Sequence, residues 1–186
     1  MFLRRLVRWV LRFRKRCGYG IHSPFAFQFV TGVVYEKGEY YAYRQLCKDC
    51  HSSRLLRIKD YKLLFRIANF QQASTFTVFP DKEADTFAFE ALMLGKRMNY
   101  TPYTETGKVE LIYAAGKWED KADKLISQLT EGGMLIVKNL RGRTRRKVWK
   151  SILKYKEAVV TFDLGDFGIV MNRPNLQREN YVINYF

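Results

Sequence analysis

The stretch from Ser74 to Gly95 constrains the fold of this chain most strongly. Its first part, Ser-Thr-Phe-Thr-Val-Phe, has the β-branched and aromatic residues typical of a buried strand, and Pro80 follows it directly. Asp81 has a side chain suited to capping the helix that comes next, whose apolar residues continue to Leu94. Strand, tight turn and helix form the repeating unit of a parallel α/β sheet, so we expect a layered α/β domain.

The turn inside this stretch, Pro80 to Asp85, contains four charged residues and no glycine. In nucleotide-binding α/β folds this turn is rich in glycine, because the backbone must come close to the ligand. The sequence therefore predicts the architecture of such a fold, with charged side chains at its usual ligand position.

Composition indicates one packed domain with a large excess of positive charge. The chain has 186 residues, of which 47% are hydrophobic, and its net charge is +15. We expect a single domain over residues 1–186, with an N-terminal helical region (1–70) and an α/β core (74–186). The positive charge favours RNA, DNA or an anionic membrane surface as a partner, although plain solubility explains it as well.

The cysteine count and the hydropathy pattern bear on the compartment. Three cysteines are too few for a disulfide scaffold, and no apolar run reaches the length of a membrane-spanning helix. We therefore expect a cytoplasmic protein, with peripheral attachment to the inner surface of the membrane as an alternative.

Two basic segments are the candidates for contact with a polyanion. Phe2–Arg16 has apolar residues at helical spacing with arginines largely on the other side, and Arg141–Lys156 reads as a strongly basic helix. The candidate polyanion-binding residues are Arg4, Arg5, Arg8, Arg12, Arg141, Arg143, Arg145 and Arg146. The alternative, a helix that packs on its own domain with solvated arginines, has the same periodicity and stays open.

The segment Cys47-Lys48-Asp49-Cys50-His51 matches the pattern of covalent haem attachment. That chemistry needs an oxidising compartment, and a zinc site needs a further ligand. We favour two thiols on a helix without a metal or haem.

The remaining pattern alternates between helices and strands. We expect helices over 40–57, 60–70, 81–97 and 118–129, and strands over 74–79, 98–103, 109–115 and 134–137. Gly132-Gly133 is expected to end the last of these helices. Ala158–Asp163 and Phe167–Asn172 flank the hairpin signal Gly165-Asp166, and Tyr181–Phe186 alternates as a closing strand.

Several segments resemble one known family. They are Gly20-Ile21-His22-Ser23-Pro24-Phe25, Tyr40-Tyr41-Ala42-Tyr43, Leu63-Leu64-Phe65-Arg66, and Thr161-Phe162-Asp163-Leu164 with Phe167-Gly168-Ile169-Val170. Together with the order of elements they resemble class I S-adenosylmethionine-dependent methyltransferases, and more closely a bacterial group of O-methyltransferase-like proteins. The resemblance implies a Rossmann-like, mostly parallel sheet with flanking helices and antiparallel C-terminal strands.

The sequence departs from this family where the family binds its cofactor and metal. The family has an acid and a glycine-rich turn after the first strand, an acid for the ribose after the second, and Asp-Gly after the fourth. Here Ala115-Gly116 takes the place of Asp-Gly, and Lys138-Asn139 follows the next strand, where acids often bind metal. The positional candidates for cofactor binding are Phe79, Asp81, Glu83, Glu105 and Ala115.

The short link between Tyr103 and Val109 leaves no room for the helix–strand–helix unit usual at this position, so we expect one α/β unit to be missing. The resulting strand edge would favour a homodimer.

Three functional hypotheses follow. In the first, the chain is a degenerate methyltransferase homologue, a pseudoenzyme that acts as a binding or structural protein. In the second, it is an active small-molecule or RNA methyltransferase with an atypical cofactor pocket, in which S-adenosylmethionine still binds. In the third, it is a basic module for RNA or an anionic membrane. The sequence identifies no catalytic residue, no substrate and no metal ligand set.

Overall fold

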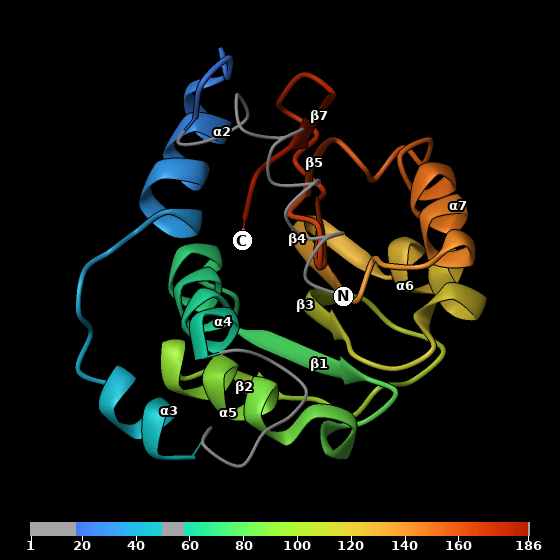
Figure 1. Ribbon diagram of the computed structural model, residues 1–186. Helices are drawn as coiled ribbons and strands as arrows, with labels where there is room; N and C mark the ends of the chain where they lie inside the picture. Colours follow the sequence, from blue (N-terminus) through green and yellow to red (C-terminus); the bar gives the residue numbers. More distant parts are fainter. Residues whose placement is uncertain (1–17, 50–57, 186) are drawn as a thin grey trace.

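A computed structural model describes residues 18–49 and 58–185. Its centre is a seven-stranded sheet with helices on both faces (Figure 1). The strands are β1 (Thr75–Phe79), β2 (Asn99–Tyr100), β3 (Val109–Ala114), β4 (Leu129–Lys138), β5 (Val160–Asp163), β6 (Phe167–Met171) and β7 (Glu179–Val182). Their order across the sheet is β2-β1-β3-β4-β6-β5-β7.

The pairing confirms the expected mostly parallel sheet. β1 pairs in parallel with β2 and β3, and β3 pairs in parallel with β4. β6 is antiparallel to both β4 and β5, and β7 pairs in parallel with β5. The hairpin predicted around Gly165-Asp166 therefore contributes β6, which runs against the other six strands of the described sheet.

The helices form two layers. The first layer contains α2 (Pro24–Phe29), η1 (Val30–Val34), α3 (Tyr43–Asp49), α4 (Ile58–Gln71), η3 (Lys82–Asp85) and α5 (Thr86–Gly95). The second contains η4 (Trp118–Lys121), α6 (Ala122–Ser127) and α7 (Arg143–Ile152). Along β3, Leu111 and Tyr113 belong to the core under the first layer, and Ile112 and Ala114 to the core under the second. Successive residues point to opposite faces of a strand, so a strand covered on both faces is apolar throughout.

The sheet is shortened at the β2 edge, as the sequence predicted. Residues 101–108 connect β2 to β3 without a helix or strand between them. β2 itself has two residues and is followed closely by Pro102. A very short edge strand next to a proline offers little backbone for pairing with another chain.

The glycine pair at 132–133 does not end a helix, and this expectation is wrong. α6 ends at Ser127, and both glycines lie inside β4. Gly132 has φ +78°, and a Cβ on Gly133 would lie 2.9 Å from the carbonyl oxygen of Thr130. Glycine is needed here because the first part of β4 bends back tightly on itself, and the register with β3 shifts at the same place.

Several expectations lie outside the described residues. These are the helix Phe2–Arg16 with Arg4, Arg5, Arg8 and Arg12, and the Cys50-His51 part of the cysteine motif. Within the described part of the chain, no helix is both long and apolar enough to cross a membrane.

Candidate functional site

The carboxyl ends of β1, β3 and β4 lie next to one another in the sheet. The chain leaves β1 toward β2 on one side, whereas β3 lies on the other, so this is the point where the strand order reverses. Ligands of open α/β sheets bind in the crevice outside such a point. The residues that follow these strands therefore form the candidate site.

Two aspartates shape the turn after β1. The Asp81 side chain accepts a hydrogen bond from the Ala84 backbone N–H at 3.0 Å, and the Asp85 side chain accepts one from the Ala88 N–H at 3.1 Å. Asp81 thus caps the short helix η3, and Asp85 caps α5. The sequence predicted a single capped helix over 81–97, and the structure divides it at Asp85.

The Asp85 carboxylate joins three elements at the site. The hydroxyl of Tyr113 on β3 donates a hydrogen bond to Oδ2 at 2.9 Å. The ammonium of Lys138, at the end of β4, donates a hydrogen bond to the same oxygen at 2.6 Å. The Asp85 side chain is fully buried, and that of Lys138 is 12% exposed. Burial, followed by the neighbouring Asp85 charge, raises the pKa of Tyr113 well above its usual value, so the hydroxyl stays a donor. The charge of Asp85 is balanced within the protein by Lys138.

The loop after β3 packs against the end of β1. The backbone N–H groups of Ala115 and Gly116 donate to the Phe79 carbonyl oxygen at 3.0 and 3.4 Å. A Cβ on Gly116 would lie 2.7 Å from Cδ of Pro80. Glycine at this position therefore allows the segment after β3 to pack directly on Pro80.

Glu105 lies in the loop between β2 and β3 and is bound to the second helical layer. It accepts hydrogen bonds from Lys121 at 2.7 Å and from Lys124 at 2.6 Å. The hydrogen bond from Lys121, followed by that from Lys124, lowers the pKa of Glu105 to about 2. The carboxylate that was the positional candidate for the ribose is thus held by two lysines.

The structure brings together only some of the positional candidates. Phe79, Asp81 and Ala115 lie at the same strand ends, whereas Glu83 is an exposed residue of η3 beside Lys82, and Glu105 faces Lys121 and Lys124. Sequence reasoning noted Lys138 as a departure from the family but did not pair it with Asp85. The two residues are 53 positions apart, and no local pattern links them.

The basic segment around α7 contains two kinds of residue. Arg141 pairs with Asp166, and Arg146 pairs with Asp163. Arg145 pairs with Glu119 at 3.0 Å. These three arginines attach α7 and the preceding loop to η4 and to the β5–β6 hairpin. Arg143, in contrast, is exposed to solvent.

A hollow of about 700 Å³ lies at the opposite edge of the sheet, where β4 begins. Two lysines and two glutamates line it, namely Lys108, Lys156, Glu131 and Glu157. Their charges balance, and the hollow is remote from the strand ends described above.

No protein-family model and no curated protein matches the sequence. Solved structures match the fold. The methyltransferase PaMTH1 of Podospora anserina, solved with bound SAH, has a TM-score of 0.54 and 9% sequence identity, covering 82% of this chain and 96% of that chain. The O-methyltransferase TomG of Streptomyces achromogenes, solved in complex with SAM, has a TM-score of 0.44 and 9% identity, covering 73% of this chain and 91% of that chain. At such identity the likeness concerns the fold alone. The chain has the fold of class I S-adenosylmethionine-dependent methyltransferases.

Proposed function

We propose that this chain keeps the methyltransferase fold without methyl transfer and acts as a binding protein. The observation that carries the proposal is the ion pair between Lys138 and the fully buried Asp85, at the point of the sheet where ligands bind. Lys138, at the end of β4, supplies from within the protein the positive charge that a metal or a cofactor would bring to this site.

The turn after β1 supports the same interpretation. Backbone N–H groups at the start of a helix are a common site for anionic groups of a ligand. Here the Ala84 and Ala88 N–H groups already donate to Asp81 and Asp85. Pro80 packs on Gly116, so a ligand has no room to reach this turn from the side of β3. The residues present at these strand ends therefore do not fit an adenosyl cofactor.

An acidic group is absent from the end of β3 as well. The resemblance places an aspartate where this chain has Ala115, and a methyl side chain cannot hold a cofactor, metal or substrate as a carboxylate does. Lys138, at the end of the next strand, points its ammonium to Asp85.

A turnover assay tests the proposal. The full chain is incubated with methyl-labelled S-adenosylmethionine and, separately, total RNA, lipid extract and small-molecule extract, with an active class I methyltransferase as positive control. We expect no label transfer above the protein-free background, against the about 1–10³ per second typical of enzymes. Label transfer that saturates with cofactor concentration would show an active enzyme with an atypical pocket, and would overturn the proposal.

A further inference from the structure

The solvent side of α7 carries a continuous line of positive charge. Arg143, Lys147 and Lys150 follow the spacing i, i+4, i+7 along the helix, and Lys154 lies in the turn that follows it. Residues at this spacing lie on one face of a helix. All four are exposed. We name these four residues the α7 stripe.

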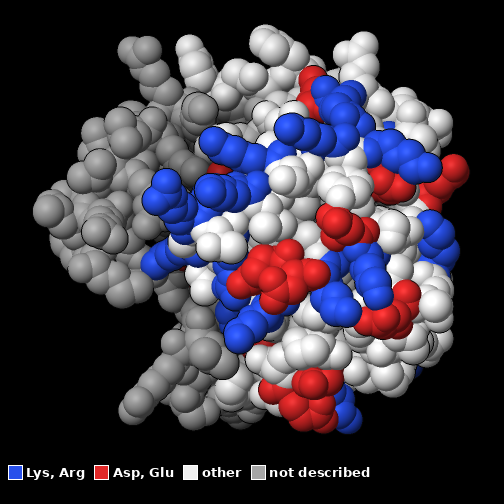
Figure 2. Space-filling view, turned by 90° about the vertical axis from the view of Figure 1, so that its right-hand side faces the viewer, with Lys and Arg blue, Asp and Glu red and all other residues white. Residues whose placement is uncertain are grey.

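The α7 stripe is separate from the arginines that hold the helix in place. Arg141, Arg145 and Arg146 each have a carboxylate partner. Within the described residues, no side chain of the α7 stripe has an ion-pair partner. The segment 141–156 contains eight Lys and Arg residues and no Asp or Glu, so the stripe is not neutralised from its own segment. Figure 2 shows Lys and Arg side chains on the face of the molecule that carries α7, with clusters of Asp and Glu side chains between them.

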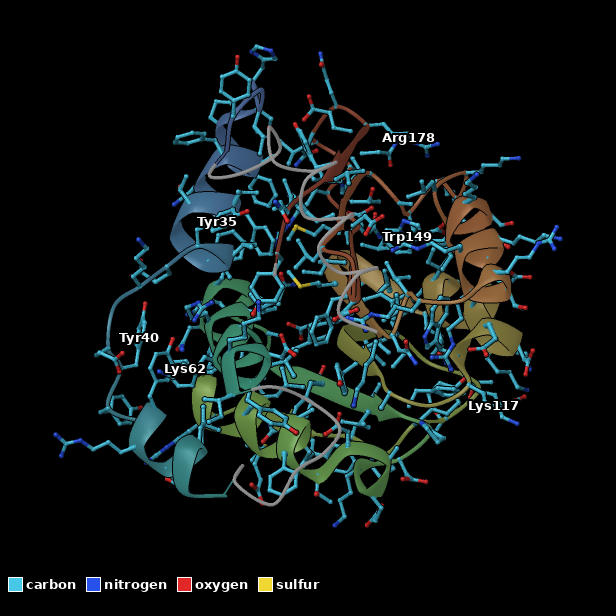
Figure 3. All side chains as sticks on the ribbon, in the orientation of Figure 1. Tyr35, Tyr40, Lys62, Lys117, Trp149 and Arg178 are labelled. Atoms are coloured by element: carbon cyan, nitrogen blue, oxygen red, sulfur yellow. The ribbon has the colours of Figure 1, made fainter. Side chains whose placement is uncertain are left out.

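The apolar side of α7 is fully used inside the protein. Trp149 projects from α7 toward the sheet (Figure 3) and is 4% exposed, and Ile152 is completely buried. A helix that lies in a membrane surface needs a free apolar face, and α7 has none to offer. The residues that flank the stripe on the exposed side, Thr144 and Ser151, are polar. The chemistry of this face fits a line of phosphates in water better than a lipid surface.

The burial of Trp149 also favours duplex over single-stranded nucleic acid as the ligand of the α7 stripe. Proteins that hold single-stranded nucleic acid stack the bases on exposed aromatic side chains. Trp149 packs in the core and is unavailable for stacking. At about 1.5 Å per residue, the line from Arg143 to Lys154 spans roughly 16 Å, the length of a few phosphates on one strand. We propose that the α7 stripe binds the phosphate backbone of duplex nucleic acid without reading its sequence. This proposal does not depend on whether the chain transfers methyl groups.

The salt dependence of the affinity for duplex DNA can be predicted from the number of charges in the α7 stripe. Four lysine or arginine contacts to phosphates predict a slope of about −3.6 in a plot of log K against log salt for duplex DNA. Between 50 and 200 mM salt, affinity should therefore fall by about 100-fold through this surface alone.

The test compares two double variants of the full chain by fluorescence anisotropy with labelled 20-base-pair DNA and RNA duplexes. Lys147→Gln with Lys150→Gln removes two charges from the α7 stripe. Lys37→Gln with Arg97→Gln removes two charges from exposed positions next to η1 and α5, on the other side of the sheet (Figure 1), and is the matched control. We expect the stripe variant to reduce the salt slope by about 2 on the DNA duplex, to weaken binding to both duplexes, and to keep its circular dichroism spectrum. The control should bind as the unmodified chain does.

Three results would overturn the proposal. The first is no duplex binding by the unmodified chain at 50 mM salt. The second is an equal effect of the stripe variant and the control, because binding would then follow net charge. The third is loss of binding to vesicles of anionic lipid in the stripe variant with duplex binding unchanged, because the partner would then be a membrane.

Discussion

Replacing Lys138 by methionine will destabilise the folded chain by about 3–5 kcal/mol, because it leaves the Asp85 carboxylate buried without a counter-charge. The Asp85 side chain is fully buried, and the Lys138 ammonium lies 2.6 Å from its Oδ2. The two remaining hydrogen bonds, from the Tyr113 hydroxyl and the Ala88 backbone N–H, come from neutral donors and do not balance a full charge. Denaturant unfolding followed by circular dichroism measures the change as a shift of the midpoint at constant slope.

A double variant separates the buried charge from the lost packing of the lysine stem. Asp85→Asn keeps an oxygen for the Ala88 N–H and removes the charge. Combined with Lys138→Met, it should be more stable than Lys138→Met alone by about 2 kcal/mol or more. If the single variant unfolds at the same denaturant concentration as the unmodified chain, the ion pair does not stabilise the site, and the interpretation of Lys138 as an internal counter-charge is wrong.

A second large loss of stability is expected when Trp149 is replaced. Its side chain is 4% exposed, and a Cβ on Gly168 of β6 would lie 2.6 Å from the indole ring, so the ring rests directly on the backbone of the sheet. Trp149→Ala removes the indole that α7 buries against Gly168 of β6 and leaves a cavity at this contact. We expect a loss of about 3–5 kcal/mol in the free energy of unfolding, measured by denaturant titration.

The neighbouring Lys150 supplies the control for Trp149. It is exposed to solvent, so Lys150→Gln should change stability by less than about 0.5 kcal/mol. A loss below about 1 kcal/mol for Trp149→Ala would mean that α7 is held mainly by the ion pairs of Arg141, Arg145 and Arg146, and that the indole contributes little.

Local signals were sufficient for the strands of the parallel core. β1 and β3 appear within a residue of their expected bounds, because each is a short apolar run between turn residues. The missing unit after β2 could also be predicted, since it follows from chain length between Tyr103 and Val109 alone. The glycine pair at 132–133 was misassigned because glycine marks a helix end and a bent strand equally well, and only the packing against Thr130 distinguishes the two.

The candidate site was less accessible to sequence reasoning. The sequence identified which strand ends matter and which acids are absent from them. The pairing of Lys138 with Asp85 depends on β4 lying two strands from β1, and that order emerges only from the folded sheet.

The roles of the charged residues in the basic segment 141–156 also depend on the folded structure. The charges of this segment were evident, but the division between ion-paired arginines such as Arg146 and solvent-exposed residues such as Lys147 depends on which side chains lie next to them in the folded chain.

Calorimetric titration of the full chain with S-adenosylhomocysteine tests whether the strand ends of β1, β3 and β4 still bind an adenosyl ligand. Binding of the product is independent of the methyl acceptor, so the measurement does not need the substrate. We expect no saturable heat up to about 1 mM ligand, which corresponds to a binding free energy weaker than about −4 kcal/mol. Saturable binding with one site per chain and a Kd in the micromolar range would contradict this expectation, because the charged turn and Lys138 would then still leave an adenosyl site.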